Sequence, residues 1–135
     1  ADFIGSPPMN FMRFNGSVAK GARSVSVAGV PVGVPEVHAD VAPGELALGV
    51  RPEHIRFSDS APLRGAVYGS EYLGTNQIVA VETPTGLVRA RLPADRNFHV
   101  GDTVGLELNT EKLSLFECRS GRAIPSSLYA GAAHV

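Results

Sequence analysis

The density of glycine and proline is the feature that most constrains how this chain folds. Fifteen Gly and ten Pro are spread over 135 residues, and they interrupt almost every window of about eleven residues. Because proline removes a main-chain donor and glycine weakens helices, amphipathic helices have little room to form. The intervals between these breaks are rich in valine and often alternate apolar with polar residues, which is typical of strands. The sequence therefore predicts an all-β protein.

Length and composition limit the class of protein further. Hydrophobic residues make up 44% of the chain, which excludes a disordered polar chain. The length suits one compact domain, or two small ones that share a core, and it buries enough surface to fold without disulfides or a metal. The single cysteine, Cys118, excludes an intramolecular disulfide and fits a reducing compartment. No apolar run approaches the length of about 20 residues that a membrane-spanning helix needs.

Charge argues against a nucleic-acid partner. Twelve Lys and Arg against 13 Asp and Glu give a formal net charge of −1, whereas nucleic-acid-binding domains usually present a basic footprint. Single-strand binders also stack bases on aromatic side chains. This sequence has no Trp, and Tyr68 and Tyr72 are the only tyrosines that share one predicted strand.

The alternation predicts where the strands lie. We expect strands at residues 11–19, 23–28, 46–51, 63–73, 77–83, 87–92, 103–108 and 113–116. Residues 30–35 also alternate, but Pro31 and Pro35 place them at a sheet edge or in a loop. Residues 42–44 predict a turn, residues 52–54 a bend and residues 126–133 a helical turn. The five strands from residue 63 onward are typical of a small closed barrel of the OB type.

Catalytic motifs are absent from the sequence. Neither lysine stands in a phosphate-binding P-loop, because Lys20 precedes Gly21 and Lys112 precedes Leu113 instead of Ser or Thr. No serine has the glycine two positions earlier that a nucleophile elbow requires. The histidines are too far apart in the sequence to share a helix face for a metal; they are His38, His54, His99 and His134. We expect no catalytic residue, metal or cofactor in this chain.

Three segments differ from generic barrel sequence. Residues 3–11 (FIGSPPMNF) combine apolar side chains with a stiff proline pair, which indicates docking either on a neighbour or on the domain's own core. Residues 48–54 (LGVRPEH) place Arg51 and Glu53 on the same side of an extended chain. Residues 67–76 (VYGSEYLGTN) contain Gly69 and Gly74, which let a strand coil sharply, and Gly74 suits a β-bulge.

In this order and at these spacings, the segments resemble the C-terminal regulatory, transport-associated OB-type domain of the ATP-binding subunits of ABC importers for sugars and glycerol phosphates. The family's FIGSPxMNF stretch matches residues 3–11, its GVRPEH motif residues 49–54 and its ExLG motif residues 71–74. A VGDxV turn at residues 100–104 and a closing LF at residues 115–116 extend the match. The resemblance implies an OB-like barrel assembly, with one barrel or two interleaved small ones.

The resemblance also implies a domain organisation and partners. It assigns residues 1–11 to a connector from a nucleotide-binding domain, residues 12–125 to the OB-like regulatory domain and residues 126–135 to a C-terminal tail. Subunits of this family form homodimers and contact the transporter's membrane subunits at the cytoplasmic face of the membrane. In some members they also bind a cytoplasmic regulatory protein. ATP and Mg²⁺ belong to the parent subunit, whose nucleotide-binding motifs this sequence lacks.

We therefore expect a non-catalytic regulatory and dimerisation domain of an importer's ATP-binding protein for carbohydrate uptake. The regulatory or interface candidates are Arg51, Glu53, Glu71, Gly74 and Asn76, and the connector candidates are Phe3, Ile4, Pro7 and Pro8. Two rival functions stay open. One is a sensor of small oxyanions, and the other is an OB module for single-stranded nucleic acid. The anion ligands of the first would be Ser70, Thr75 and Asn76 beside Gly74.

Overall fold

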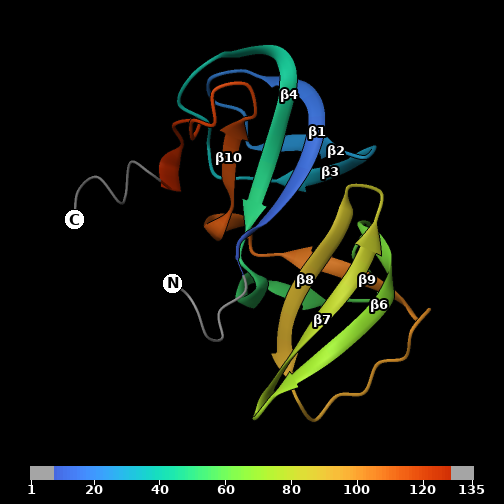
Figure 1. The fold of residues 1–135 in the computed structure, drawn as a ribbon. Helices are drawn as coiled ribbons and strands as arrows, with labels where there is room; N and C mark the ends of the chain where they lie inside the picture. Colours follow the sequence, from blue (N-terminus) through green and yellow to red (C-terminus); the bar gives the residue numbers. More distant parts are fainter. Residues whose placement is uncertain (1–7, 129–135) are drawn as a thin grey trace. The chain divides into compact units, whose positions relative to one another are not determined.

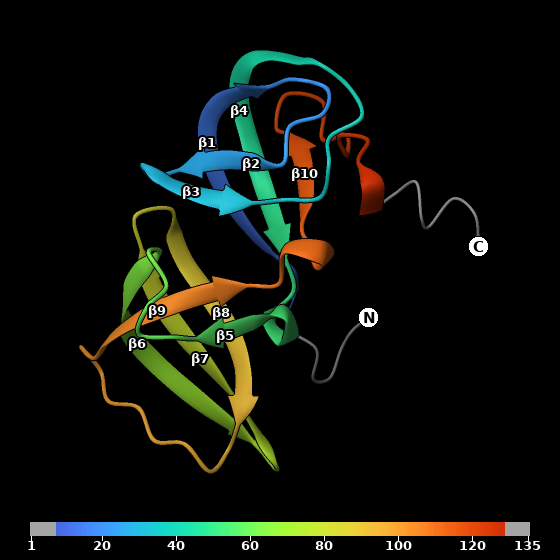
Figure 2. The ribbon, with the colours of Figure 1, turned by 180° about the vertical axis from the view of Figure 1, so that it is seen from behind.

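The computed structural model describes residues 8–128. Apart from two 3-10 turns and a helical start at residues 127–128, its regular elements are strands, which confirms the all-β prediction. The chain folds into two compact units, shown in Figures 1 and 2. Unit 1 holds residues 51–108 together with Asn10, and unit 2 holds residues 11–50 together with the chain from Asn109 onward. The chain enters unit 2, leaves for unit 1 and returns, so of the two alternatives, one unit or two interleaved ones, the fold has the second.

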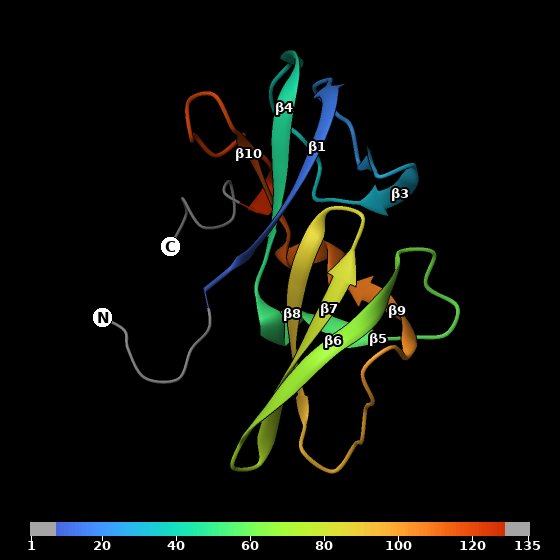
Figure 3. The same cartoon turned by 45° about the vertical axis from the view of Figure 1, so that its right-hand side comes forward.

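Unit 1 contains a five-stranded antiparallel sheet in the order β5-β9-β6-β7-β8. Its strands are β5 (Ile55–Phe57), β6 (Arg64–Leu73), β7 (Asn76–Thr83), β8 (Gly86–Pro93) and β9 (Thr103–Leu108). Figure 3 shows β6, β7 and β8 side by side. Alternate side chains of β7 and β8 point into the core of the unit, where they are fully or almost fully buried; examples are Val79, Val81, Val88 and Ala90. A 3-10 turn, η1 (Pro52–His54), packs beside β8.

Unit 2 contains a three-stranded sheet and a hairpin. The sheet has the order β1-β4-β10, from β1 (Asn10–Val18), β4 (Val41–Val50) and β10 (Ser114–Glu117). The hairpin pairs β2 (Ser24–Val27) with β3 (Val30–Gly33), so residues 30–33 form an edge strand, as Pro31 predicts. The turn residues Ala28 and Gly29 both have positive φ, which a two-residue turn between twisted strands requires. A 3-10 turn, η2 (Thr110–Lys112), precedes β10.

The five strands expected in one barrel are divided between the two units. β10 pairs with β4 in unit 2, with Leu115 opposite Leu48, and β5 takes the fifth place in the sheet of unit 1. The edge strands β5 and β8 approach each other, but no ladder joins them among the described residues. The sheet of unit 1 is therefore open, and the prediction of a closed barrel is wrong. Alternation along one strand specifies its buried face but not its partner strand.

The predicted turn at residues 42–44 is also wrong, because these residues lie inside β4. β10 pairs only with residues 46–49, so the first half of β4 has no ladder with β10. A proline is tolerated where its missing N–H faces an open edge. Pro43 therefore continues the strand instead of ending it.

The bulge expected at Gly74 lies elsewhere on the same strand. The register between β6 and β7 shifts between Val67 and Gly69, so the extra residue is Tyr68. Gly74 has φ +70° and is the first residue of the two-residue turn that joins Leu73 to Asn76. Glycine is favoured there because an L side chain is strained at positive φ.

Candidate functional site

Three of the five regulatory candidates lie together at one end of unit 1. Glu71 is exposed on β6 opposite Ile78, Gly74 forms the turn, and Asn76 begins β7 opposite Leu73. Since residues 71 and 73 are two positions apart on one strand, Glu71 and Asn76 lie on the same face of the sheet. The structure therefore groups Glu71, Gly74 and Asn76 around one hairpin.

The other two candidates, Arg51 and Glu53, lie at the 3-10 turn η1. Arg51 is the N-cap residue and Glu53 the middle residue of the turn, and both side chains are exposed. Among residues 8–128, no ion pair joins them. Pro52 begins a tight turn there, so the extended geometry that would place them on one side is not formed. The next residue, His54, keeps a buried Nδ1 without a hydrogen-bond partner.

Replacing Arg51 with alanine is expected to change the free energy of unfolding by less than about 1 kcal/mol. The guanidinium is exposed and lacks an ion-pair partner among the described residues, and exposed charges contribute little to stability. Urea denaturation measures the change, with Glu53→Ala as the matched control at the same turn. A loss of about 3 kcal/mol or more would reveal a buried ion pair and contradict this placement.

Asn10 is a functional candidate that sequence reasoning missed. Its side chain is 8% exposed, its Oδ1 accepts from the main-chain N–H of Arg89 at 2.8 Å, and its Nδ2 donates to the carbonyl of Arg89 at 2.8 Å. Because β8 is an edge strand of its sheet, the amide supplies the partner that a neighbouring strand would have supplied. The available signal was a polar amide inside the apolar stretch of residues 9–11, since buried polar groups require partners.

The expected connector falls almost entirely outside the described residues. Phe3, Ile4 and Pro7 lie outside residues 8–128, and Pro8 is exposed. Asn10 is therefore the residue through which the described end of the connector motif is fixed to unit 1.

Gln77 is a second buried polar residue in unit 1. It is fully buried, and its Nε2 donates to the carbonyl of Pro93 at 2.9 Å and to that of Arg96 at 2.6 Å. These bonds fix the end of β8 and the start of the loop that leads to β9. The Oε1 of Gln77 has no hydrogen-bond partner.

That loop borders a polar cavity of about 400 Å³ in unit 1. The guanidinium of Arg96 lies 5.1 Å from the ring centre of Phe98, which in turn packs edge-on against Phe57. Asp102 accepts a hydrogen bond from the main-chain N–H of His99 at 2.8 Å. Arg96 and Asp102 therefore both have partners within this loop.

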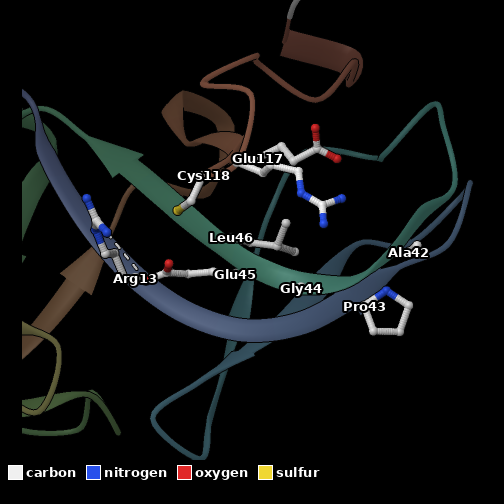
Figure 4. Close-up of a pocket in the computed structure, with 9 residues that line it drawn as sticks. Arg13, Ala42, Pro43, Gly44, Glu45, Leu46, Glu117 and Cys118 are labelled. Atoms are coloured by element: carbon white, nitrogen blue, oxygen red, sulfur yellow. Dashed lines mark hydrogen bonds and ion pairs between the residues drawn. The ribbon is translucent and has the colours of Figure 1, made fainter.

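A second cavity, of about 370 Å³, lies in unit 2 between the start of β4 and the turn that follows β10 (Figure 4). Four charged side chains line it: Arg13 lies 3.4 Å from Glu45, Glu117 accepts from the hydroxyl of Ser120 at 2.7 Å, and Arg119 carries the fourth charge. Cys118 lines the same cavity as a free thiol. With two charges of each sign, the lining has no net charge that would attract an ion.

The residues expected to bind an oxyanion are not all brought together. Ser70 lies opposite Val79, whereas Asn76 lies opposite Leu73. Because residues 70 and 73 differ by an odd number on one strand, Ser70 and Asn76 lie on opposite faces of the sheet. Asn76 and Thr75 do contact each other, with a hydrogen bond of 3.4 Å between their side chains.

Within residues 8–128, no cluster of three or more His, Cys, Asp or Glu side chains is placed to hold a metal ion. In that part of the chain, no helix is long and apolar enough to cross a membrane.

Comparison with known proteins finds two domain families that match this sequence, one in its first part and one in its later part. The TOBE domain matches residues 48–116, and the MalK OB fold domain matches residues 5–55. The osmoprotective compounds uptake ATP-binding protein GgtA of Synechocystis is 31% identical over 132 residues, which cover 92% of this chain and 36% of that protein. The sn-glycerol-3-phosphate import ATP-binding protein UgpC of Ruegeria pomeroyi is 32% identical over 132 residues, which cover 92% and 34%. The chain thus spans about a third of the length of these relatives.

A solved structure shares the fold. The cytoplasmic molybdate-binding protein ModG superposes with a TM-score of 0.62 at 14% sequence identity, and the match covers 86% of this chain and 96% of that one. At this identity the likeness concerns the fold alone.

The sequence motifs and the matches agree. The TOBE match covers slightly more than half of the chain and includes all five regulatory candidates, and the MalK OB fold match begins within the connector motif. The resemblance to the transport-associated OB-type domains of importer ATP-binding subunits is confirmed. This chain belongs to the TOBE domain family.

Proposed function

We propose that this chain is the regulatory and dimerisation domain of the ATP-binding subunit of a carbohydrate or glycerol-phosphate importer. The observation that carries the proposal is the pair of overlapping family matches, which together run through both units. The relatives GgtA and UgpC are import ATP-binding proteins in which the matched region makes up about a third of the length. ATP and Mg²⁺ would bind in the remainder of such a parent subunit, because the P-loop pattern is absent around Lys20 and Lys112.

The proposed role is mechanical. Two copies of the domain hold each other, so that the nucleotide-binding domains of their parent subunits stay paired when they separate. Asn10 supports this role, because it fixes the motif next to the nucleotide-binding domain onto an edge strand of unit 1. The partners of this assembly are a second copy, the nucleotide-binding domain, the membrane subunits and a cytoplasmic regulatory protein. The assembly would lie at the inner face of the membrane.

Sedimentation and nucleotide titration of the chain test this function. We expect a reversible, concentration-dependent dimer and no heat of binding on titration with Mg-ATP. A chain that is monomeric at every concentration would contradict the dimerisation role. Stoichiometric binding or hydrolysis of ATP would contradict the non-catalytic role.

A sensor of small oxyanions is the second candidate function, and the fold that this chain shares with molybdate-binding ModG supports it. A ligand that binds only the native state raises the unfolding temperature. Thermal unfolding in millimolar molybdate, sulfate and phosphate separates the two functions. We expect no shift, whereas a shift that saturates with one of these anions would favour the sensor.

A further inference from the structure

Strands β6, β7 and β8 of unit 1 have one side that points into the core and one that points away from it. We call the residues on the side that points away the β6–β8 face. Gln77, Val79 and Val81 of β7 are fully buried in the core, so the alternate residues of β7 point to the opposite side. Antiparallel neighbours share a face, and each outward residue of β7 therefore forms a row with one residue of β6 and one of β8.

One row of this face carries opposite charges at its two ends. Glu71 of β6 and Arg91 of β8 lie on either side of Ile78. Among the described residues, neither has an ion-pair partner, and the Nε of Arg91 is buried without a hydrogen bond. The row thus carries an exposed carboxylate and a half-buried guanidinium, separated by two strand spacings, and its central residue, Ile78, is only 7% exposed.

The outermost rows of the face end in apolar residues. The row through Asn76 has Leu73 at one end and Pro93 at the other. Leu73 is 36% exposed.

The row at the opposite margin of the face also ends in apolar residues. It passes through Glu82, with Ala66 on β6 and Leu87 on β8, and Leu87 is 38% exposed. What favours a second copy on this face is its charge pattern, because opposite charges at the two ends of one row complement the same row of another copy.

We propose that a second copy of this chain packs its own β6–β8 face against this one, about a two-fold axis parallel to β7. The inference rests on the proposed dimerisation function and names the surface that performs it. A rotation about that axis keeps each row in place and exchanges β6 with β8. Glu71 of each copy then faces Arg91 of the other, so the two unpaired charges of each copy are both neutralised.

The remaining rows also match under this rotation. Leu73 faces Pro93 of the other copy, and Leu87 faces Ala66 of the other copy, so apolar ends meet apolar ends. Ala80 meets its own copy on the axis, where a small side chain lets two sheets approach to the usual packing distance of about 10 Å.

The two Glu82 side chains also meet near the axis. Arg89 lies in the neighbouring row, opposite Ala80. A two-fold axis perpendicular to the strands would place β6 against β6, which leaves Glu71 and Arg91 without opposite charges.

Charge reversal tests this interface by sedimentation equilibrium of the complete chain. In Glu71→Arg, two arginines face each other at both ends of the row, and in Arg91→Glu two glutamates do so. We expect each variant to weaken self-association by about tenfold or more, because like charges opposed in an interface are strongly unfavourable. An equimolar mixture of the two variants restores both pairs and is expected to associate as tightly as the unmodified chain.

Matched controls carry the same change of charge away from the face. Glu111→Arg lies on η2 and Arg119→Glu follows β10, both exposed in unit 2, and both are expected to self-associate as the unmodified chain does. Circular dichroism confirms that each variant is folded. If the unmodified chain dimerises and both single variants dimerise equally well, or their mixture gains nothing, this inference is overturned while the dimerisation function stands. A monomeric unmodified chain contradicts the function itself.

Discussion

Replacing Gly105 with alanine is expected to destabilise the protein by about 3 kcal/mol or more. A Cβ at this position of β9 would collide with the carbonyl oxygen of Ser58, and it would come within 2.8 Å of Nη1 of Arg64 and 3.0 Å of the carbonyl of Ala61. Arg64 could move aside, but the two carbonyls belong to the main chain of a tight connection after β5. The strain must therefore move the backbone.

A glycine with open surroundings provides the control for this prediction. A Cβ at Gly44 of β4 meets nothing within 4 Å, so Gly44→Ala is expected to leave stability unchanged or slightly raised. Urea unfolding of both variants gives the two free energies. Equal stabilities for Gly105→Ala and Gly44→Ala would show that the chain near Ser58 does not lie as described.

Asn10→Ala is expected to cost about 2–4 kcal/mol of unfolding free energy. The change removes both hydrogen bonds to Arg89 and leaves a main-chain N–H and a carbonyl without their partner at a part-buried edge. Each unsatisfied buried group costs about 1–3 kcal/mol. Chemical denaturation followed by circular dichroism measures the loss.

Two further variants separate the hydrogen bonds from other effects of truncation. Asn10→Asp keeps the size of the side chain and the acceptor for the N–H of Arg89, but it sets an acceptor-only carboxylate oxygen against the carbonyl of Arg89, so a loss at least as large as that of Asn10→Ala is expected. Asn15 is exposed on the same strand, and Asn15→Ala is expected to change stability by less than about 0.5 kcal/mol. If Asn10→Ala were as stable as Asn15→Ala, the bonds to β8 would contribute nothing.

Local pattern predicted the elements of this fold better than their arrangement. The strands expected at residues 77–83 and 103–108 lie at β7 and β9 within one residue, because short apolar segments bounded by turn residues are a direct signal for strands. Local pattern could not predict that residues 113–116 join the sheet of unit 2 instead of the sheet formed by the strands before them. It depends on the pairing of β10 with β4, more than sixty residues away in the sequence.

The candidate site shows the same limit. Motif matching selected Glu71, Gly74 and Asn76, and the fold groups these three at one hairpin. It did not select Asn10 or Arg91, because the role of Asn10 depends on β8 being an edge strand and the role of Arg91 depends on its register with β6 and β7. Neither property can be read from the residues adjacent in the sequence.

Transport by a hybrid subunit tests the central claim most directly. The matched third of UgpC from Ruegeria pomeroyi is replaced by this chain, and uptake of sn-glycerol-3-phosphate is compared with that of the intact and the truncated subunit at equal abundance. If the chain braces an ATP-driven importer subunit, the hybrid is predicted to support clearly more uptake than the truncated subunit. A folded hybrid that assembles with the transporter but supports no more uptake than the truncated subunit would contradict that role.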